Sequence, residues 1–293
     1  MCLKYKKPVV IAEQGCTSLG NIDNAKKMID MASESGANYV KFQKRNPRES
    51  LRPEQWSMPH PNPEFSYGKN YLEHREALEF DLDQHKELKD YCEERKIGYS
   101  TSVWDVTSAK QIVTLKPDFI KVPSACNNNF EMLEILKNTY HGCIIISLGM
   151  TTKEEERDLI KFLGSECLEE RVVLMSCTSG YPVKFEDVCL LEIKRLVNEY
   201  CDGLRSAKAF GYSNHALGIA MGPVAYALGA QYIEYHYIDD RTKKHTDASA
   251  SLEPGGLRKL VRDLNATYQA LRYKDKEILD IEQPQREKLK YKK

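Results

Sequence analysis

The chain has 293 residues, of which 41% are hydrophobic and 29% are charged, so it can bury a large core and is not expected to be disordered. Its 43 basic and 43 acidic residues balance, which gives no general electrostatic reason to expect nucleic acid or an acidic membrane as a partner. No stretch approaches the run of about 18 apolar residues that a membrane helix needs.

The cysteines and the N-terminus bear on the cellular compartment. The nine cysteines include no CxxC pair, so the sequence carries no zinc-ribbon or thioredoxin signal. The first eight residues contain three lysines, and only a short apolar run follows before Glu13, which is not the pattern of a signal peptide. We therefore expect a cytoplasmic protein.

Short β-branched runs alternate with helical patterns along the chain, which is typical of parallel α/β structure. The helical patterns carry apolar residues at i, i+3 and i+4, as in Ala25, Met28 and Ile29. Eight such units, with a last helix near 254–273, favour a closed (β/α)8 TIM barrel over an open doubly wound sheet. One barrel domain is expected over residues 1–275. The eight predicted strands are residues 9–15, 39–43, 98–103, 118–122, 143–148, 171–177, 207–213 and 231–237.

One connection, residues 44–81, breaks this alternation. It contains five prolines and the aromatic residues Trp56 and Tyr71. Loops of this length are usually functional or disordered, and loops that follow barrel strands lie on the face where active sites form. We interpret residues 44–81 as a lid over the substrate, the alternative being a loop without function.

Polar side chains gather at the predicted C-terminal ends of the strands. Lys41, Lys121 and Glu234 lie within apolar strands, where a charge costs free energy unless it is paired or used. Two lysines and a glutamate at one barrel mouth suit an anionic ligand with an acid/base partner. A buried ion-pair network that only stabilises the fold is the alternative.

Two histidines end adjacent predicted strands. His215 and His236 therefore face one cavity, and neutral imidazole is a common ligand of divalent transition metals. Glu13 and Asp247 are expected within reach, so the sequence predicts a metal site that Mn, Fe, Co or Zn would suit. The remaining histidines are expected on the surface or in the lid, namely His60, His74, His85, His141 and His245.

Several motifs point to one family. Residues 11–15 read IAEQG, residues 36–43 read GANYVKFQ, and residues 211–215 read GYSNH. Together with KVPS at 121–124, YLEHREALE at 71–79, SLGM at 147–150 and EYHY at 234–237, they resemble the sialic acid synthase (N-acetylneuraminate synthase) family over about residues 8 to 275. No dinucleotide-binding, P-loop or nucleophile-elbow motif competes with this resemblance.

The resemblance implies a TIM-barrel transferase that condenses phosphoenolpyruvate with an N-acetylhexosamine. The acceptor would be N-acetylmannosamine or its phosphate, and the product a nine-carbon 2-keto acid with release of phosphate. His215 and His236 would hold a divalent metal, first Mn2+, with Mg2+ or Co2+ as alternatives. Glu13 and Asp247 would orient water or a sugar hydroxyl and move protons. The expected substrate-binding residues are Lys41, Thr101, Lys121, Ser124, Ser147, Tyr181 and Ser213.

The chain departs from the family pattern at three points. Cys126 stands where the family usually has a glutamate, and Ser179 where it usually has an asparagine. Both are expected to face substrate, so we expect a changed sugar acceptor. Typical members also continue through a linker into a C-terminal antifreeze-like domain. The charged tail 276–293 resembles a remnant of that linker. The lid, a separate capping protein or nothing would replace that cap, and a homodimer through barrel helices is expected.

Two other functions stay open at this point. One is a related condensation of phosphoenolpyruvate with a different aldose or aldose phosphate. The other is a sugar- or phosphate-binding barrel without catalysis, against which the joint presence of the histidines and the lysines argues.

Overall fold

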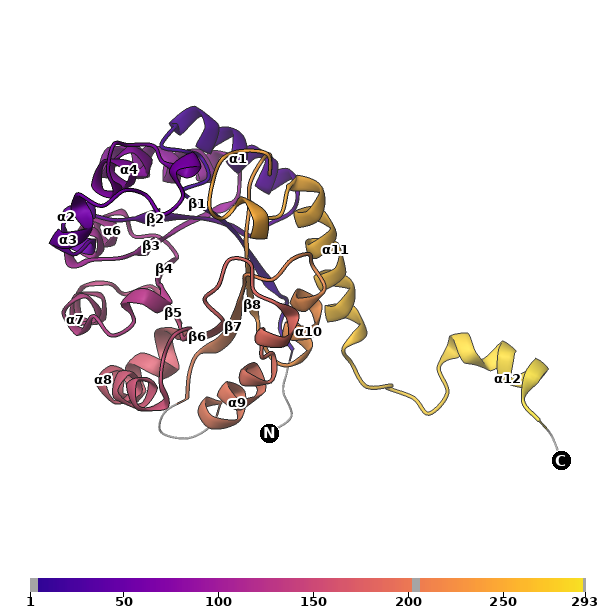
Figure 1. The fold of residues 1–293 in the computed structure, drawn as a ribbon. Coiled ribbons are helices and arrows are strands. Elements are labelled where there is room, and N and C mark those ends of the chain that lie inside the picture. Colours follow the sequence, from indigo (N-terminus) through magenta and orange to yellow (C-terminus); the bar gives the residue numbers. More distant parts are fainter. Residues whose placement is uncertain (1–4, 202–205, 292–293) are drawn as a thin grey trace.

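The computed structural model describes residues 5–201 and 206–291. Eight parallel strands pair in sequence order and close into a barrel, with helices around the outside (Figure 1). This confirms the predicted TIM barrel, and each predicted strand boundary lies within two residues of the observed one. The strands are β1 (Val9–Gly15), β2 (Tyr39–Lys44), β3 (Gly98–Val103), β4 (Phe119–Val122), β5 (Cys143–Ser147), β6 (Val172–Cys177), β7 (Ala209–Asn214) and β8 (Tyr232–His236).

The outer helices begin at side-chain caps. Asn21, Asp81, Asp105 and Asn129 each accept a hydrogen bond from a backbone N–H of the first helical turn, which satisfies a donor that the helix leaves unpaired. The helices that cover the barrel are α1 (Ile22–Glu34), α5 (Leu82–Glu94), α6 (Val106–Leu115), α7 (Phe130–Thr139), α8 (Lys153–Arg171), α9 (Leu191–Tyr200), α10 (Met221–Ala227) and α11 (Pro254–Ala270).

Side chains alternate along each strand between the barrel interior and the helix layer. On β2, Val40 and Phe42 pack into the outer core, whereas Lys41 and Gln43 line the interior. The interior is apolar at its N-terminal end, where Ile11 belongs to the inner cluster. It becomes polar at its C-terminal end, where Glu13 follows on the same face of β1. The barrel therefore presents its charged interior residues at one mouth.

Residues 44–81 fold into short helices at the C-terminal end of β2. These are α2 (Pro47–Ser50), α3 (Pro53–Trp56), the 3-10 turn η1 (Pro63–Phe65) and α4 (Tyr71–Leu78). His60 and His74 pack ring to ring within this segment, with centroids 4.3 Å apart, and both are buried. The Tyr67 hydroxyl donates to the carbonyl of Lys244 at 2.6 Å, which joins the segment to the loop after β8.

Two of the five histidines predicted on the surface or in the lid, His85 and His245, lie in neither place. His85 lies in the core between α5 and β3, where its Nδ1 is 2.8 Å from the Tyr99 hydroxyl. His245 is also buried, in the loop after β8. Sequence spacing gave no sign of these contacts, because each joins elements that are distant along the chain.

The C-terminal segment leads away from the barrel (Figure 1). It forms the 3-10 turn η5 (Asp280–Glu282) and α12 (Gln283–Leu289), held by local ion pairs such as Lys274–Glu282 at 2.8 Å. Ile281 is 82% exposed. The interpretation of 276–293 as a linker remnant stays a prediction. None of the helices in the part of the chain that the structure describes is both long and apolar enough to span a membrane.

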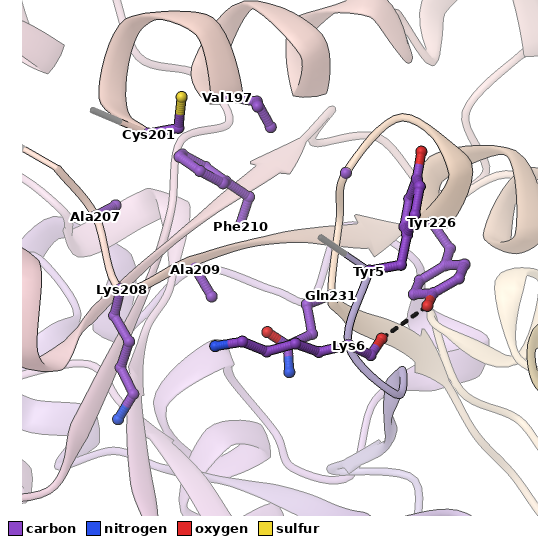
Figure 2. Close-up of a pocket in the computed structure, with 11 residues that line it drawn as sticks. Tyr5, Lys6, Val197, Cys201, Ala207, Lys208, Ala209, Phe210, Tyr226 and Gln231 are labelled. Carbon is purple, nitrogen blue, oxygen red and sulfur yellow. Dashed lines mark hydrogen bonds between the residues drawn. The ribbon is translucent and has the colours of Figure 1, made fainter. Parts of the chain in front are cut away.

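A further cavity, of about 180 Å³, opens at the N-terminal end of β7 and β8 (Figure 2). The Tyr226 hydroxyl donates to the carbonyl of Lys6 at 2.7 Å and ties the N-terminal segment to α10 (Figure 2). This end of a TIM barrel generally serves stability rather than catalysis.

Candidate active site

A cavity of about 260 Å³ opens at the C-terminal mouth of the barrel. Its walls come from strand ends and the loops after them, which is where TIM-barrel enzymes build their sites. Most of the predicted site residues line it: Glu13, Lys41, Lys121, Ser124, Ser147, Ser179, Tyr181, Ser213, His215 and His236.

A chain of ion pairs forms the floor of this cavity. Lys41 Nζ lies 2.5 Å from Glu13 Oε2 and 3.9 Å from Glu234 Oε2. Glu234 also pairs with Lys121 and accepts a hydrogen bond from the Ser213 hydroxyl at 3.0 Å. All four charged side chains are almost fully buried. Each of the four groups has a partner of opposite sign, so the floor holds no uncompensated charge when all four are ionised.

The two carboxylates of this chain differ in their pKa. Burial raises the pKa of Glu13, and the single ammonium of Lys41 does not offset it. Burial also acts on Glu234, but Lys121 and Lys41 outweigh it and lower the pKa of Glu234 to about 2. Glu234 therefore stays ionised while Glu13 takes up a proton more readily, which is the pattern of an acid/base group beside a fixed charge.

Hydroxyl groups complete the walls. Ser124 Oγ accepts the backbone N–H of Gly149 at 3.0 Å, which orients that side chain. Ser147 Oγ is buried and has no hydrogen-bond partner among the described residues. Because an unpaired buried hydroxyl costs free energy, Ser147 is prepared to donate to a bound ligand.

His215 and His236 lie side by side, with ring centroids 5.3 Å apart. His215 Nδ1 is 2.7 Å from the Thr178 carbonyl, which only accepts, so in the neutral ring Nδ1 carries the proton and Nε2 presents a lone pair. Burial lowers the pKa of His236 to about 4, which keeps this imidazole neutral. Its Nδ1 is buried without a hydrogen-bond partner in the described part of the chain. His236 is thus in the neutral form that a metal ion requires. Burial acts to lower the pKa of His215, but the Cys177 sulfur and the Thr178 carbonyl outweigh it and raise that pKa, so His215 must lose its Nε2 proton before it binds a metal ion.

The two carboxylates predicted near the metal, Asp247 and Glu13, differ in their distance from the histidines. Asp247 Oδ2 lies 3.8 Å from Nδ1 of His236, whereas Glu13 pairs with Lys41. Within residues 5–201 and 206–291, no three His, Cys, Asp or Glu side chains gather closely enough to hold a metal ion by themselves. A metal here would have two imidazole ligands and take its remaining ligands from water or substrate.

A second cavity, of about 280 Å³, adjoins the first. The two share a wall that includes Gln43, Tyr181 and His236. Asp247 lies in this second cavity, where burial raises its pKa but His236 and the neighbouring His245 outweigh that effect and lower it. Residues of the 44–81 segment form the opposite wall, namely Arg45, Phe65, His74, Arg75 and Leu78.

Two predicted substrate-binding residues lie elsewhere. Thr101 pairs with Phe42 in the strand register and so faces the helix layer, and Ser102 lines the cavity in its place. Cys126 lies in a turn after β4, where its Sγ donates to the carbonyl of Trp104 at 3.3 Å. The prediction that these two side chains face substrate is corrected accordingly.

Some lining residues were missing from the predicted set. Glu234 had been placed at the barrel mouth beside the lysines but had been given no role of its own. Gln43 was visible as a polar residue inside an apolar strand, and strand register would have placed it. Cys177, whose Sγ lies 3.8 Å from Nδ1 of His215, was visible at the end of β6. Arg45 and Arg75 carried no such signal, because the fold of residues 44–81 alone brings them to the site.

Comparison with known proteins identifies the family. The model of the NeuB family matches residues 28–276. Human N-acetylneuraminate-9-phosphate synthase is 38% identical over 281 residues, which are 96% of this chain and 76% of that protein. The N,N'-diacetyllegionaminic acid synthase of Campylobacter jejuni is 29% identical over 91% of this chain and 78% of its own length.

A solved structure agrees with these matches. The N-acetylneuraminic acid synthetase of Leptospira borgpetersenii, crystallised with citrate, superposes with a TM-score of 0.80 at 26% identity and covers 98% of this chain and 94% of that one. The barrel, the charged mouth and these relatives lead to one conclusion: the chain belongs to the NeuB family and is a synthase of the N-acetylneuraminate synthase type.

Proposed function

We propose that this protein condenses phosphoenolpyruvate with an N-acetylmannosamine-like amino sugar, in a metal-dependent reaction that gives a nonulosonic 2-keto acid and phosphate. The observation that carries the proposal is the buried Glu13–Lys41–Glu234–Lys121 chain on the cavity floor. It holds two ammonium groups beside one permanently ionised carboxylate and one that takes a proton readily.

Phosphoenolpyruvate fits the first cavity by charge. Its phosphate and carboxylate need positive groups and hydroxyl donors, which Lys41, Lys121 and Ser147 supply within a buried site. Ser124 and Ser213 add hydroxyls to the same walls. Low solvent exposure strengthens each of these interactions, so the cavity is suited to hold a small molecule that carries both a phosphate and a carboxylate.

The two histidines fit a divalent metal, which we propose to be Mn2+. His215 and His236 would hold it through neutral ring nitrogens, and Asp247 would steady His236 from 3.8 Å away. When bound, such an ion polarises a carbonyl oxygen as a Lewis acid.

The proposed reaction forms one carbon–carbon bond. The enol carbon of phosphoenolpyruvate attacks the aldehyde carbon of the open-chain sugar, whose oxygen takes up a proton. Water adds to the resulting cationic carbon and loses a proton, and the adduct collapses to the 2-keto acid as its C–O bond to phosphate breaks. Glu13 is the group that passes a proton, because its pKa is raised and Gln43 Nε2 fixes its carboxylate with a hydrogen bond of 2.8 Å. Glu234 pairs with both lysines, through Oε2 with Lys41 and through Oε1 with Lys121.

The second cavity is where we propose that the sugar lies. It joins the phosphoenolpyruvate cavity at Tyr181 and His236, so the aldehyde end of an acceptor would meet the enol carbon at this wall. Ser179 lies at the same mouth, and we expect its hydroxyl to contact the amide substituent of the acceptor sugar. We propose that residues 44–81 act as the lid of this cavity, because they line its far wall.

Mass spectrometry of the product tests this proposal. We expect a nonulosonic acid from phosphoenolpyruvate, N-acetylmannosamine or its 6-phosphate, and Mn2+, with the bridging oxygen of phosphoenolpyruvate recovered in phosphate. Recovery of that oxygen in the keto acid would contradict C–O cleavage. A product only from simple aldoses would favour the related aldose-condensing activity, and binding without any product would favour a non-catalytic barrel.

A further inference from the structure

Arg45 is the first residue after β2, and its side chain points back into the site. It lines the second cavity and is mostly buried, with an exposed fraction of 12%. Its guanidinium lies over the Trp104 ring, 3.7 Å from the ring centroid. Its backbone N–H donates to Glu79 Oε2 at 2.9 Å. Arg45 is therefore fixed both by the barrel and by the far end of residues 44–81.

Two hydrogen bonds in sequence connect Arg45 to Glu13. Arg45 Nη2 donates to Gln43 Oε1 at 2.5 Å, and Gln43 Nε2 donates to Glu13 Oε1 at 2.8 Å. The Cys16 thiol also faces Gln43 Oε1, at 3.7 Å. Because a guanidinium has donors and no acceptor, it determines which end of the amide faces it. The amide oxygen turns toward Arg45, and the NH2 group turns toward Glu13.

Gly15 allows the amide of Gln43 to approach Glu13 closely. Its φ is +53°, in the left-handed region that favours glycine. A Cβ at this position would lie 3.0 Å from Gln43 Nε2 and 3.2 Å from Glu13 Oε1. A side chain there would press on the hydrogen bond between the two, so the backbone itself leaves the space that this bond occupies.

The charges near Arg45 are offset by carboxylates of the same region. Arg45 Nη1 lies 3.7 Å from Glu79 Oε1, which also accepts from Arg75 Nη2 at 3.0 Å. Asp247 lines the same cavity as the two arginines. Two arginines thus face two carboxylates, and no surplus of positive charge marks this wall as an anion site. The bond to Gln43 is the contact that connects Arg45 to the chemistry.

We propose that Arg45 is a positioning residue for the reaction, which holds the Gln43 amide with its NH2 group on Glu13 and so keeps the Glu13 carboxylate in place. This inference rests on the proposed function, in which Glu13 passes a proton. Without Arg45, Gln43 Oε1 would keep only the weak thiol donor of Cys16, and the amide would be free to turn into the second cavity. Small displacements of a reacting group reduce turnover strongly, so the loss should fall on kcat.

A double-mutant cycle tests this role in the full-length protein. Phosphate release is measured with Mn2+, saturating phosphoenolpyruvate and whichever of N-acetylmannosamine and its 6-phosphate is turned over. Arg45→Met should lower kcat about 10- to 100-fold and change the KM for the sugar by less than about threefold. In a Gln43→Leu protein the same substitution should change kcat by less than about twofold, because the amide through which Arg45 acts is gone. Equal losses in the two backgrounds would overturn the inference.

Arg48 offers a matched control for the cycle. It lies in the same segment, is 61% exposed and pairs with Glu76, so Arg48→Met should keep the kcat of the wild type. Circular dichroism establishes that each variant is folded before its kinetics are compared. A raised KM for the sugar with an unchanged kcat in Arg45→Met would make Arg45 a substrate-binding group and overturn the positioning role.

Hydrogen exchange of the Gln43 side-chain amide gives a second readout, which needs no turnover. The protein is labelled with ¹⁵N-glutamine, and the Gln43 NH2 signal is assigned by its loss in Gln43→Leu. We expect this signal to exchange at least about tenfold faster in Arg45→Met than in wild type or Arg48→Met, because a hydrogen bond to a charged group is lost. An unchanged exchange rate in Arg45→Met would overturn the inference.

The two readouts separate this inference from the proposed function. Exchange that depends on Arg45 in a wild-type protein without phosphate release would contradict the condensation and support the contact of Arg45 with Gln43. Phosphate release that is equally fast in Arg45→Met would contradict the positioning role and leave the condensation standing.

Discussion

At the scale of residues, the site depends on a contrast between two glutamates that share one lysine. Two ammonium groups outweigh the burial of Glu234 and lower its pKa, whereas one ammonium group, that of Lys41, and the Gln43 amide do not outweigh the burial of Glu13. We expect Glu13→Gln to lower kcat about 10²- to 10⁴-fold, the usual contribution of a general acid or base. Affinity for phosphoenolpyruvate should change little, because the lysines remain. Steady-state kinetics would measure kcat, and a direct binding titration would measure the affinity for phosphoenolpyruvate. A kcat within threefold of wild type would exclude Glu13 from proton transfer.

The ion pairs also bear on stability. Lys121→Met leaves Glu234 buried with only Lys41, at 3.9 Å, to compensate it. Removing one partner of a buried pair usually costs about 3–5 kcal/mol, so the free energy of unfolding in urea should fall by about 3 kcal/mol. The double variant Lys121→Met, Glu234→Gln should regain part of that loss. If the single variant were as stable as wild type, Glu234 would not depend on Lys121.

At the scale of elements, α5 contains a buried titratable group, His85, that lines neither cavity of the mouth. Burial lowers the pKa of His85 to about 3, below the value of about 6.5 of an unfolded histidine. Between these values the unfolded chain binds the extra proton, so the stability is complete above about pH 6.5 and falls as the pH drops toward 3. One such proton contributes a slope of about 1.4 kcal/mol per pH unit.

Urea unfolding between pH 7 and 4 measures this slope. His85→Gln should reduce the dependence of the free energy of unfolding on pH by up to the equivalent of one proton. This holds even if the variant is less stable than wild type at every pH. The exposed residue His141 provides the control, because His141→Gln should leave the slope unchanged. An unaltered slope in His85→Gln would mean that this imidazole is not held neutral in the folded protein.

Strands and their inward residues were predictable from sequence, because the period of two and the apolar runs specify both the element and the face. The same period explains the error at Thr101. In the strand register its neighbour Ser102 pairs with Gln43 and so faces the barrel interior, as Lys41 and Gln43 do. Cys126 was misplaced because its turn after β4 has no regular period. The position of Arg75 depends on how α4 packs against the barrel, and no local pattern encodes that packing.

At the scale of the whole molecule, the C-terminal segment is held by its own local contacts. Residues of η5 and α12 are exposed and make their ion pairs locally. Removing residues 276–293 should therefore change the free energy of unfolding by less than about 0.5 kcal/mol, as for surface changes generally. A larger loss in thermal or urea unfolding would mean that the segment packs on this barrel or on a second copy.

Phosphate release is the measurement that tests the central claim most directly. Purified full-length protein is incubated with phosphoenolpyruvate, Mn2+ and either N-acetylmannosamine or its 6-phosphate, and inorganic phosphate is followed over time. The account predicts release that requires the amino sugar, stops on chelation and is lost in His215→Ala and His236→Ala proteins that remain folded. Release without any sugar, or no release from a folded, metal-loaded protein with either sugar, would contradict it.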